Sequence, residues 1–188
     1  MSTLEIEGLY NQFKIKAEAV AAQVYRVHDV TKANRLIAQL LKEQNAHQIV
    51  ISESDLTQQG RLATELRTEG FTVFTTDLRG WSPQADAGIS QVDLAVAESG
   101  SLAQDATEVA TRVVSTLPPI HIALVLTGNL HANLNEALSA FYSTGKVPSY
   151  INFITGPSRT SDIERVLTIG VHGPEKLLIV FVDQGGEF

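Results

Sequence analysis

Residues 48–74 read QIVISESDLTQQGRLATELRTEGFTVF, and they decide the fold class of this chain. Residues 48–52 form a short apolar run that is typical of a buried strand, and residues 71–74 form a second one. Between them, residues 59–68 have the spacing of a helix that ends at Glu69-Gly70. A strand, a helix and a strand at this spacing make a βαβ unit. The sequence therefore predicts an α/β fold with a mainly parallel sheet sandwiched by helices.

Toward the C-terminus the same alternation continues. Residues 120–126 have the strongest strand pattern in the chain, and two later apolar runs, at 151–155 and 177–182, indicate further strands. Helices are expected at 107–116 and 133–142. Residues 86–92 are expected to form a short capped element. It leads into a hairpin whose first strand is 93–98 and whose turn is Ser99-Gly100.

Toward the N-terminus the pattern is helical. Apolar residues recur at helical spacing from Leu4 to Val27, which predicts one long leading helix. Residues 28–31 interrupt it, and Asp29 or Thr31 can cap a second helix that runs through Leu41. We expect a single domain over residues 1–188, with a helical lead-in at 1–45 and the sheet core at 46–188.

The composition excludes several classes of function. The sequence contains no cysteine, which excludes disulfides, thiolate metal sites and an iron-sulfur cluster held by these residues. The formal net charge is -7 without any block of like charges, so neither nucleic acid nor an anionic membrane is expected as a partner. No window approaches the roughly 18 apolar residues of a membrane helix, and no signal peptide is apparent. We expect a cytoplasmic protein without membrane insertion.

The strongest candidate site is a predicted strand-to-helix corner that follows the strand at 151–155. Gly156-Pro157 is typical of a turn, and the hydroxyl and acidic residues behind it suit the start of a helix. Helix N-termini attract anions outside the carboxyl ends of parallel strands, and Arg159 would add a planar fork for a carboxylate or phosphate. The alternative is an ordinary capped helix in which Arg159 and Asp162 pair at the surface. The candidate ligand-binding residues of this corner are Gly156, Ser158, Arg159, Thr160, Asp162 and Glu164.

Two further segments hold candidate catalytic residues. His172 lies beside Gly173, a candidate ligand-binding residue, in a loop that suits a proton shuttle or a ligand contact. The alternative is a structural histidine. Glu98 ends an apolar strand, where it could be a nucleophile, a base or a hydrogen-bond acceptor, or simply the polar end of the strand. Its neighbours are candidate ligand-binding residues, namely Ser99, Gly100 and Ser101.

No cofactor or metal is expected in this chain. Neither GxGxxG nor GxxxxGK[ST] occurs, so no fingerprint of a dinucleotide or ATP site is present. The histidines lack the spacing of metal ligands. Ser99 and Ser101 lack the flanking glycines of a nucleophile elbow, which disfavours a serine hydrolase.

The candidate segments resemble the LUD-domain family, in particular its lactate utilisation protein C branch. The resemblance is carried by DAGISQVDLAVAESGSL at 86–102, by Arg112 with STLPPIHIALV at 115–125, and by TGPSRTSDIERVLTIGVHGPEKL at 155–177. Where the family often shows Glu-Thr-Gly-Thr, residues 98–101 are Glu-Ser-Gly-Ser, which keeps the hydroxyls. The resemblance implies a fold related to the ribose-phosphate isomerase, glucosamine-phosphate deaminase and CoA-transferase group, with an N-terminal helical extension.

The resemblance also implies a function. It implies a role in the bacterial oxidation of L-lactate to pyruvate alongside two iron-sulfur partner proteins. This chain would be a non-redox subunit that binds a small anionic metabolite. Two alternatives come from other classes. One is a stand-alone isomerase or acyl/CoA-transferase-type enzyme that uses Glu98, and the other is a structural scaffold subunit.

Overall fold

The computed structural model describes residues 3–143, 148–161, 167–169 and 173–184. The helices are α1 (Thr3–Ala19), α2 (Val30–Glu43), α3 (Asp55–Gln59), α4 (Leu62–Thr68), α5 (Leu78–Trp81), α6 (Val109–Thr116) and α7 (Leu134–Ser143), with 3-10 turns η1 (Ser82–Gln84) and η2 (Thr127–Asn129). The strands are β1 (Gln23–Asp29), β2 (Gln48–Ile51), β3 (Thr72–Phe74), β4 (Ala87–Gln91), β5 (Leu94–Val96), β6 (Ser101–Asp105), β7 (Ile120–Leu126), β8 (Leu130–His131), β9 (Ile151–Ile154), β10 (Arg159–Ser161), β11 (Leu167–Ile169) and β12 (Lys176–Gln184).

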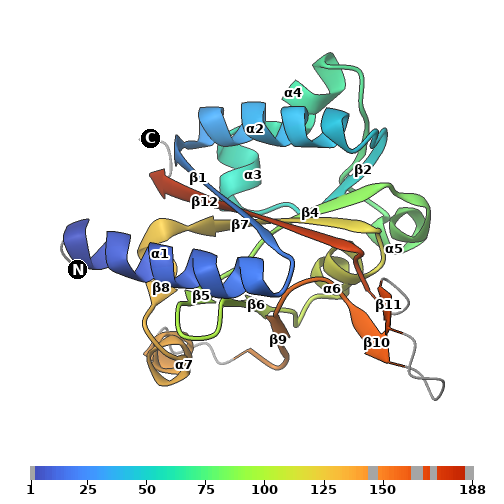
Figure 1. Cartoon of the computed structure of the whole chain (residues 1–188). Coiled ribbons are helices and arrows are strands. Elements are labelled where there is room, and N and C mark those ends of the chain that lie inside the picture. Colours follow the sequence, from blue (N-terminus) through green and yellow to red (C-terminus); the bar gives the residue numbers. More distant parts are fainter. Residues whose placement is uncertain (1–2, 144–147, 162–166, 170–172, 185–188) are drawn as a thin grey trace.

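A six-stranded sheet forms the centre of the molecule, in the order β1-β12-β7-β4-β2-β3 (Figure 1). All of its neighbouring strands run parallel. The predicted α/β fold with a mainly parallel sheet is therefore confirmed. The βαβ unit at 48–74 is present as β2 and β3, with α3 and α4 between them.

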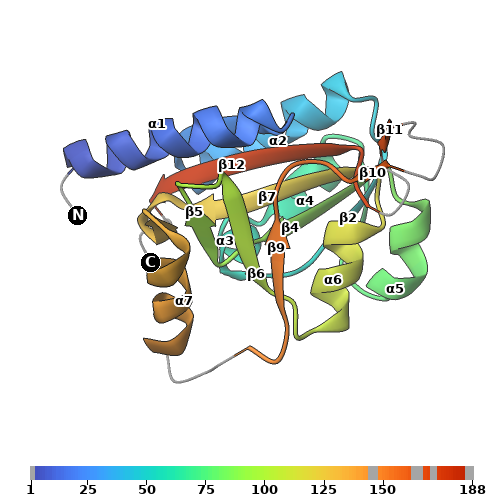
Figure 2. The same ribbon diagram turned by 60° about the horizontal axis from the view of Figure 1, so that its bottom comes forward.

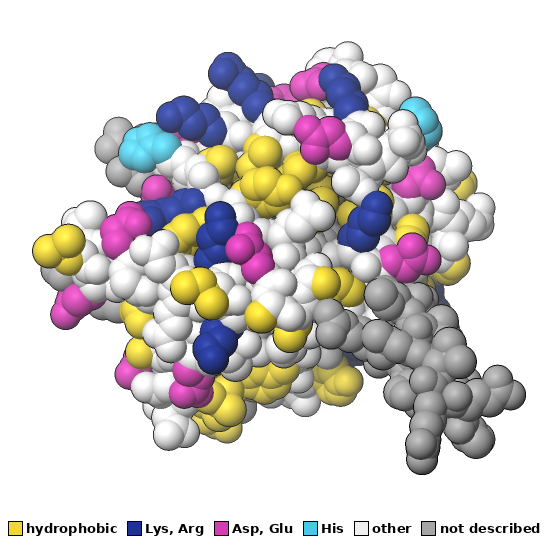
Figure 3. Space-filling view, in the orientation of Figure 1, with side chains coloured by type: hydrophobic (Ala, Val, Ile, Leu, Met, Phe, Trp, Pro, Cys, Tyr) yellow, Lys and Arg dark blue, Asp and Glu magenta, His cyan; other side chains and the backbone are white. Residues whose placement is uncertain are grey.

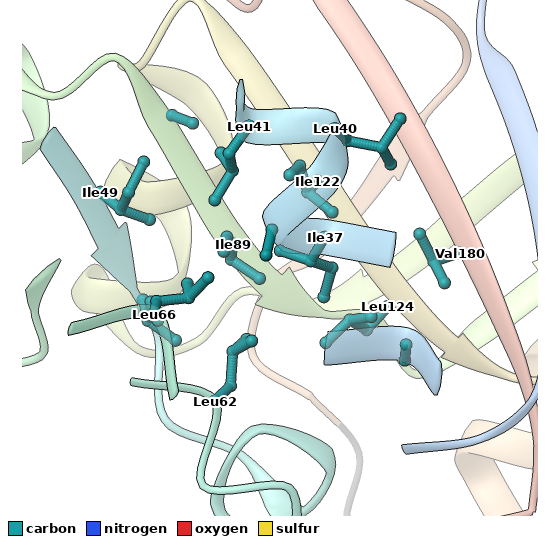
Figure 4. Close-up of a cluster of buried hydrophobic side chains, with 14 of the residues drawn as sticks. Ile37, Leu40, Leu41, Ile49, Leu62, Leu66, Ile89, Ile122, Leu124 and Val180 are labelled. Carbon is teal, nitrogen blue, oxygen red and sulfur yellow. The ribbon is translucent and has the colours of Figure 1, made fainter. Parts of the chain in front are cut away.

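Both faces of this sheet are buried, because side chains along its central strands alternate between two cores. On β7, Ile122 and Leu124 face a core built with α2, α3 and α4, and Figure 4 shows Ile37, Leu62 and Leu66 converging on them from these helices. On the other face, Ala123 and Val125 join a core with α1. A strand that is buried on both sides needs a continuous apolar run, which is why 120–126 and 177–182 were readable in the sequence.

A second sheet, in the order β8-β5-β6-β9, lies beside α1 on that other face (Figure 2). The expected hairpin is present: β5 and β6 pair antiparallel around the turn at residues 97–100. Helix α7 covers the second sheet through Ala137 and Phe141, which contact Leu94, Val96 and Ala103. The molecule is thus layered. Helices α2, α3 and α4 cover one face of the parallel sheet, and the second sheet and α1 cover the other face. Helix α7 lies outside the second sheet.

The leading helix is shorter than the sequence pattern predicts. Helix α1 ends at Ala19, and Ala21 adopts a left-handed conformation with φ 69°. The residues that follow form β1, which pairs in parallel with β12 from Gln23↔Leu178 onward. The prediction of one helix from Leu4 to Val27 was wrong: Val24 and Val27 have helical spacing, but in the strand they face the two opposite cores. The second helix begins as predicted, with Asp29 Oδ1 accepting from Lys32 N at 2.8 Å.

Residues 86–92 also differ from expectation. They were expected as a short capped element, but 87–91 are the strand β4, which lies between β2 and β7 in the parallel sheet. Asp86 does cap, although not its own segment: its Oδ2 accepts from the backbone N–H groups of His47 and Gln48. It thereby fixes the start of the neighbouring strand β2.

Candidate functional site

The chain order of the parallel strands reverses at β2. Strand β3 lies on one side of β2, and β4, which comes later in the chain, lies on the other side. In open α/β sheets such a reversal opens a crevice outside the carboxyl ends of the two strands, because the following segments leave in opposite directions. The residues at this position are Ser52 to Asp55, after β2, and Gln91 to Asp93, at the end of β4.

A cavity of about 230 Å³ occupies this position. It adjoins a wider one of about 780 Å³ between the large sheet, the second sheet and α7. The two cavities share three carboxylates, those of Asp55, Asp93 and Asp105. We call the two together the carboxyl-edge cleft. Its first part is lined by Ser52, Glu53, Ser54, Asp55, Gln91, Asp93, Asp105 and Thr111.

Hydrogen bonds hold the polar side chains of this cleft in place. Gln91 Oε1 accepts from Leu56 N at 3.1 Å, and Asp93 Oδ2 accepts from Asp105 N at 2.6 Å. Burial raises the pKa of Asp93, the Asp105 N–H partly opposes this, and the nearby Asp105 charge adds to it. The cleft therefore suits hydroxyl groups, which can donate to these carboxylates, better than it suits a bare anion.

A third cavity, of about 340 Å³, lies at the carboxyl ends of β2 and β3. It shares Glu53 with the carboxyl-edge cleft but has a different charge, because Arg61 and Arg67 also line it. We call it the arginine pocket. Of these three cavities, it is the one lined by arginine side chains, which could pair directly with a carboxylate or phosphate group.

A polar network is buried between the two sheets behind the cleft. Ser90 Oγ lies 2.9 Å from His121 Nε2, and Gln104 Nε2 donates to Ser90 Oγ at 2.9 Å. Burial lowers the pKa of His121 to about 4. The ring is therefore neutral near pH 7, and which of Ser90 Oγ and His121 Nε2 donates in their hydrogen bond depends on the tautomer of the ring. His121 is thus a buried, neutral histidine within a polar network.

The residues predicted around Glu98 do lie together with those near Gly156. Ser101 Oγ and Thr155 Oγ1 are 2.8 Å apart, because β6 and β9 pair. Glu98 itself is exposed, and its Oε1 accepts from Leu134 N at 2.9 Å, at the start of α7. In this structure Glu98 therefore caps a helix, whereas a nucleophile that is activated by burial would need a desolvated carboxylate.

The helix of the predicted strand-to-helix corner falls on residues 162–166, which lie outside the described residues. Strand β9 belongs to the second sheet, and residues 159–161 form β10, which pairs antiparallel with β11. Arg159 and Thr160 thus lie on a strand. Ser158 N donates to Pro174 O at 2.8 Å, and an added Cβ on Gly173 would lie 3.1 Å from Ser158 Cβ, so these two segments do meet. The candidates Asp162, Glu164 and His172 lie outside the described residues.

Strands β10 and β11, which we call the hairpin from here on, lie at the amino ends of the parallel strands, whereas the predicted site was expected at their carboxyl ends. Glu175 N and Lys176 N donate to Pro119 O, just before β12 and β7 begin. Figure 1 shows β10 and β11 at the opposite end from the arrowhead of β12. The rule that ligands bind at the carboxyl ends of parallel strands therefore supports the cleft and the arginine pocket, and it does not apply to the hairpin.

Sequence reasoning missed the residues of the cleft and of the arginine pocket, although a signal was present. Ser52-Glu53-Ser54-Asp55 directly follows a buried strand and precedes a helix, which is the position that the carboxyl-end rule selects. Asp105 and Thr111 gave no such signal, because their place in the cleft depends on the second sheet and on α6.

The surface and the described side chains limit the other classes of site. On the face seen in Figure 3, Lys and Arg side chains alternate with Asp and Glu, without a patch of one sign. Within the described ranges, no group of three or more His, Asp or Glu side chains could hold a metal ion. No described helix is both long and apolar enough to cross a bilayer.

Comparisons with known proteins agree with the resemblance noted in the sequence. A family model described as LUD domain matches residues 10–182. Lactate utilization protein C 1 of Bacillus mycoides is 30% identical over 194 residues, covering 94% of this chain and 80% of that protein. Lactate utilization protein C of Halalkalibacterium halodurans is 32% identical over 178 residues, covering 87% of this chain and 77% of that protein.

Other matches are partial or purely structural. Lactate utilization protein C of Shouchella clausii is 40% identical over 102 residues, and this chain spans only 44% of its length in the alignment. The crystal structure of a DUF162 family protein from Deinococcus radiodurans superposes with a TM-score of 0.67 and 19% identity, covering 97% of this chain and 99% of that one. At this identity the superposition shows a shared fold alone.

Proposed function

This chain belongs to the LUD domain family, and on that premise we propose that it is the non-redox component of a bacterial system that oxidises L-lactate to pyruvate. The observation that carries the proposal is the 30% identity with Lactate utilization protein C 1 of Bacillus mycoides over 94% of this chain. We place the protein in the cytoplasm, where lactate metabolism would supply its ligand.

The chemistry of lactate oxidation supports a division of labour. Oxidation of a hydroxyl to a ketone removes two electrons and two protons, and the electrons need an acceptor. These 188 residues offer no cysteine for an iron-sulfur cluster and no nucleotide fingerprint for a flavin or nicotinamide. The electrons would therefore pass to partner proteins that carry iron-sulfur clusters. This chain would bind and orient a small anionic ligand.

Two places on the chain are candidates for that ligand. The sequence favours the segment of Ser158, Arg159 and Gly173, with Glu98 and His172 as residues that could act on the ligand. The carboxyl-end rule favours the arginine pocket and the adjoining cleft. Both contain an arginine, whose guanidinium can form two parallel hydrogen bonds with a carboxylate.

Growth and turnover measurements test the proposed role. In a bacterium that encodes this chain, deleting its gene should stop growth on L-lactate and leave growth on glucose unchanged, and the intact gene should restore it. Purified chain should not oxidise L-lactate, whereas the chain with both iron-sulfur partners should. Normal growth of the deletion strain on lactate, or robust turnover by the chain alone, would contradict the proposal.

A further inference from the structure

We infer that the arginine pocket is the site of a small 2-hydroxy carboxylate, with Arg61 and Arg67 binding its carboxylate and Glu53 accepting a hydrogen bond from its hydroxyl. This inference deepens the proposed function and rests on it for the choice of a hydroxy acid over other anions. The pocket is lined by Ile51, Glu53, Thr57, Gln58, Arg61, Ala63, Thr64, Arg67 and Thr75.

The charges of the pocket match such a ligand. Two guanidinium groups and one carboxylate line a volume of about 340 Å³, together with the hydroxyls of Thr57, Thr64 and Thr75. Arginine is suited to a carboxylate because its planar fork can donate two parallel hydrogen bonds. A carboxylate such as that of Glu53 only accepts hydrogen bonds, so it favours a ligand that brings a donor. A hydroxy acid brings both groups on adjacent carbons.

Both arginines have donors available for a ligand. Arg67 Nη2 donates to Val73 O at 2.8 Å, which holds the guanidinium beside β3, and its other N–H groups have no hydrogen-bond partner among the described residues. For the Arg61 side chain, no hydrogen bond or ion pair is found within the described part of the chain. Glu53 contacts Gln58 instead, with Gln58 Nε2 3.4 Å from Glu53 Oε2.

The backbone of Arg61 is held in a conformation that its own side chain disfavours. Arg61 has φ 48° and ψ 36°, the left-handed region that glycine and asparagine adopt most readily. The buried amide of Asn34 stabilises this turn, since Asn34 Nδ2 donates to Gly60 O at 2.6 Å and to Glu65 Oε2 at 2.9 Å. A strained residue that is held from behind and lines a cavity is typical of a ligand-binding position.

The pocket is built on a rigid element. Leu62 and Leu66 are 0% and 1% exposed, and they anchor one side of α4 in the core, as Figure 4 shows. Ala63, Thr64 and Arg67 follow on the adjacent side of the same helix and line the pocket. The backbone of α4 is therefore fixed relative to the sheet, and the hydrogen bond to Val73 O also holds the Arg67 guanidinium before a ligand arrives, which lowers the entropic cost of binding.

Calorimetric titration of the full chain with L-lactate, pyruvate and phosphate tests the inference. Arg61→Gly should weaken L-lactate binding by roughly 10- to 100-fold, because charge-assisted hydrogen bonds are lost. The melting temperature of this variant without ligand should not fall, since glycine accepts φ 48° without strain. Glu53→Gln should bring the affinities for L-lactate and pyruvate closer together, because pyruvate has no hydroxyl to donate.

Two control variants separate these effects. Arg35→Ala removes an exposed arginine of α2 that does not line the pocket, and it should leave binding unchanged. Asn45→Gly changes another left-handed residue, with φ 53°, and reports the effect of the backbone alone. Arg61→Lys should restore binding only in part, because the ammonium keeps the charge but not the planar fork.

The outcomes distinguish this inference from the proposed function. Unchanged L-lactate binding by Arg61→Gly overturns the inference. If Arg159→Ala abolishes that binding instead, the ligand binds at the hairpin and the proposed function stands. Wild-type protein that binds none of the three anions also overturns the inference, while growth on lactate still decides the proposed function. Phosphate that binds more tightly than L-lactate in an Arg61-dependent way supports the anion site and overturns the hydroxy-acid assignment.

Discussion

Two glycines allow the second sheet to approach helix α1 closely. Gly100 has φ 67°, and an added Cβ would lie 2.4 Å from Ala17 N. Gly156 has φ 74°, and an added Cβ would lie 2.6 Å from Val20 O. In both cases the obstacle is backbone, which cannot rotate away as a side chain can. The turns at 98–101 and 156–158 therefore meet the same end of α1.

We predict that Gly100→Ala and Gly156→Ala each lower the free energy of unfolding by about 1–3 kcal/mol, because each adds both left-handed strain and a clash. Gly8→Ala is the control. Gly8 lies in α1 with no neighbouring atom within 4 Å, so alanine there should stabilise the protein by about 0.5–1 kcal/mol. Urea denaturation of the three variants measures these changes. Equal stability of Gly100→Ala and wild type would show that α1 can move away from the turn.

Titration of His121 should make the stability of the protein depend on pH. Burial lowers its pKa from 6.5 to about 4, so between these values the unfolded chain binds a proton that the folded chain does not. The free energy of unfolding should have its full value above pH 6.5 and should fall as the pH drops toward 4. The contribution of this residue is about 3 kcal/mol, at about 1.4 kcal/mol per pH unit.

Denaturation of wild type and His121→Gln at several pH values checks this prediction. The variant is expected to be less stable at pH 7, because it disturbs a buried network with Ser90 and Gln104. Its stability should nevertheless decline less between pH 6.5 and 4 than that of wild type. Parallel curves for the two proteins over this range would show that His121 does not titrate as its burial implies.

At the scale of elements, Arg26 joins three parts of the fold. Its Nε donates to Asp183 Oδ1 on β12 at 2.6 Å, and its Nη1 donates to Glu7 Oε1 on α1 at 2.6 Å. The guanidinium also lies 5.2 Å from the centre of the Tyr10 ring. Helix α1 is thus tied by charge to the edge of the parallel sheet as well as packed against it through apolar side chains.

We predict that Arg26→Ala lowers the free energy of unfolding by about 1–3 kcal/mol, because it leaves the partly buried Asp183 without its charged partner. Arg26→Lys should recover only part of this, since lysine cannot bind Asp183 and Glu7 with one planar group. Lys14→Ala is the control. Lys14 pairs with Glu18 at 3.7 Å on the exposed face of α1, and its loss should cost less than about 0.5 kcal/mol. If Lys14→Ala and Arg26→Ala lower the free energy of unfolding by similar amounts, the Arg26 pair contributes no more than an exposed ion pair.

At the scale of the whole molecule, the two cores share the central strands. Strands β7 and β12 contribute side chains to both cores, so a substitution that destabilises one core should also destabilise the other. Phe13 on α1 is 0% exposed and packs edge-to-face on Phe181, with ring centres 5.0 Å apart. Trp81, the single tryptophan, stacks on Phe74 in another part of the molecule, with ring centres 4.0 Å apart.

We predict that Phe13→Ala destabilises the chain by about 3–5 kcal/mol, the usual cost of truncating a buried phenylalanine. Because small single domains usually unfold in one cooperative step, Trp81 fluorescence and far-UV circular dichroism should report the same shifted transition. Phe74→Leu, which changes the surroundings of Trp81 directly, controls for local effects on fluorescence. A Trp81 transition that stays at the wild-type position in Phe13→Ala would show that the two cores unfold separately.

The fold class, the family and most of the strands could be predicted from the amino-acid sequence. Those conclusions depend on local patterns, such as the apolar runs at 48–52 and 120–126 and the helix predicted at 59–68, or on the family segment at 155–177. A strand that is buried on both faces must be apolar throughout, so its pattern is visible without knowledge of its neighbours.

The remaining strands and the arginine pocket could be identified only in the folded structure, because each depends on residues that are distant in the sequence. Residues 23–29 are a strand since β12, near the other end of the chain, supplies the backbone groups for β1. Residues 159–161 are a strand since residues 167–169 pair with them. The arginine pocket arises where Glu53, Arg61 and Thr75 meet at the ends of two adjacent strands. A local sequence pattern cannot predict that these residues lie together, since strand pairing and burial depend on the fold of the whole chain.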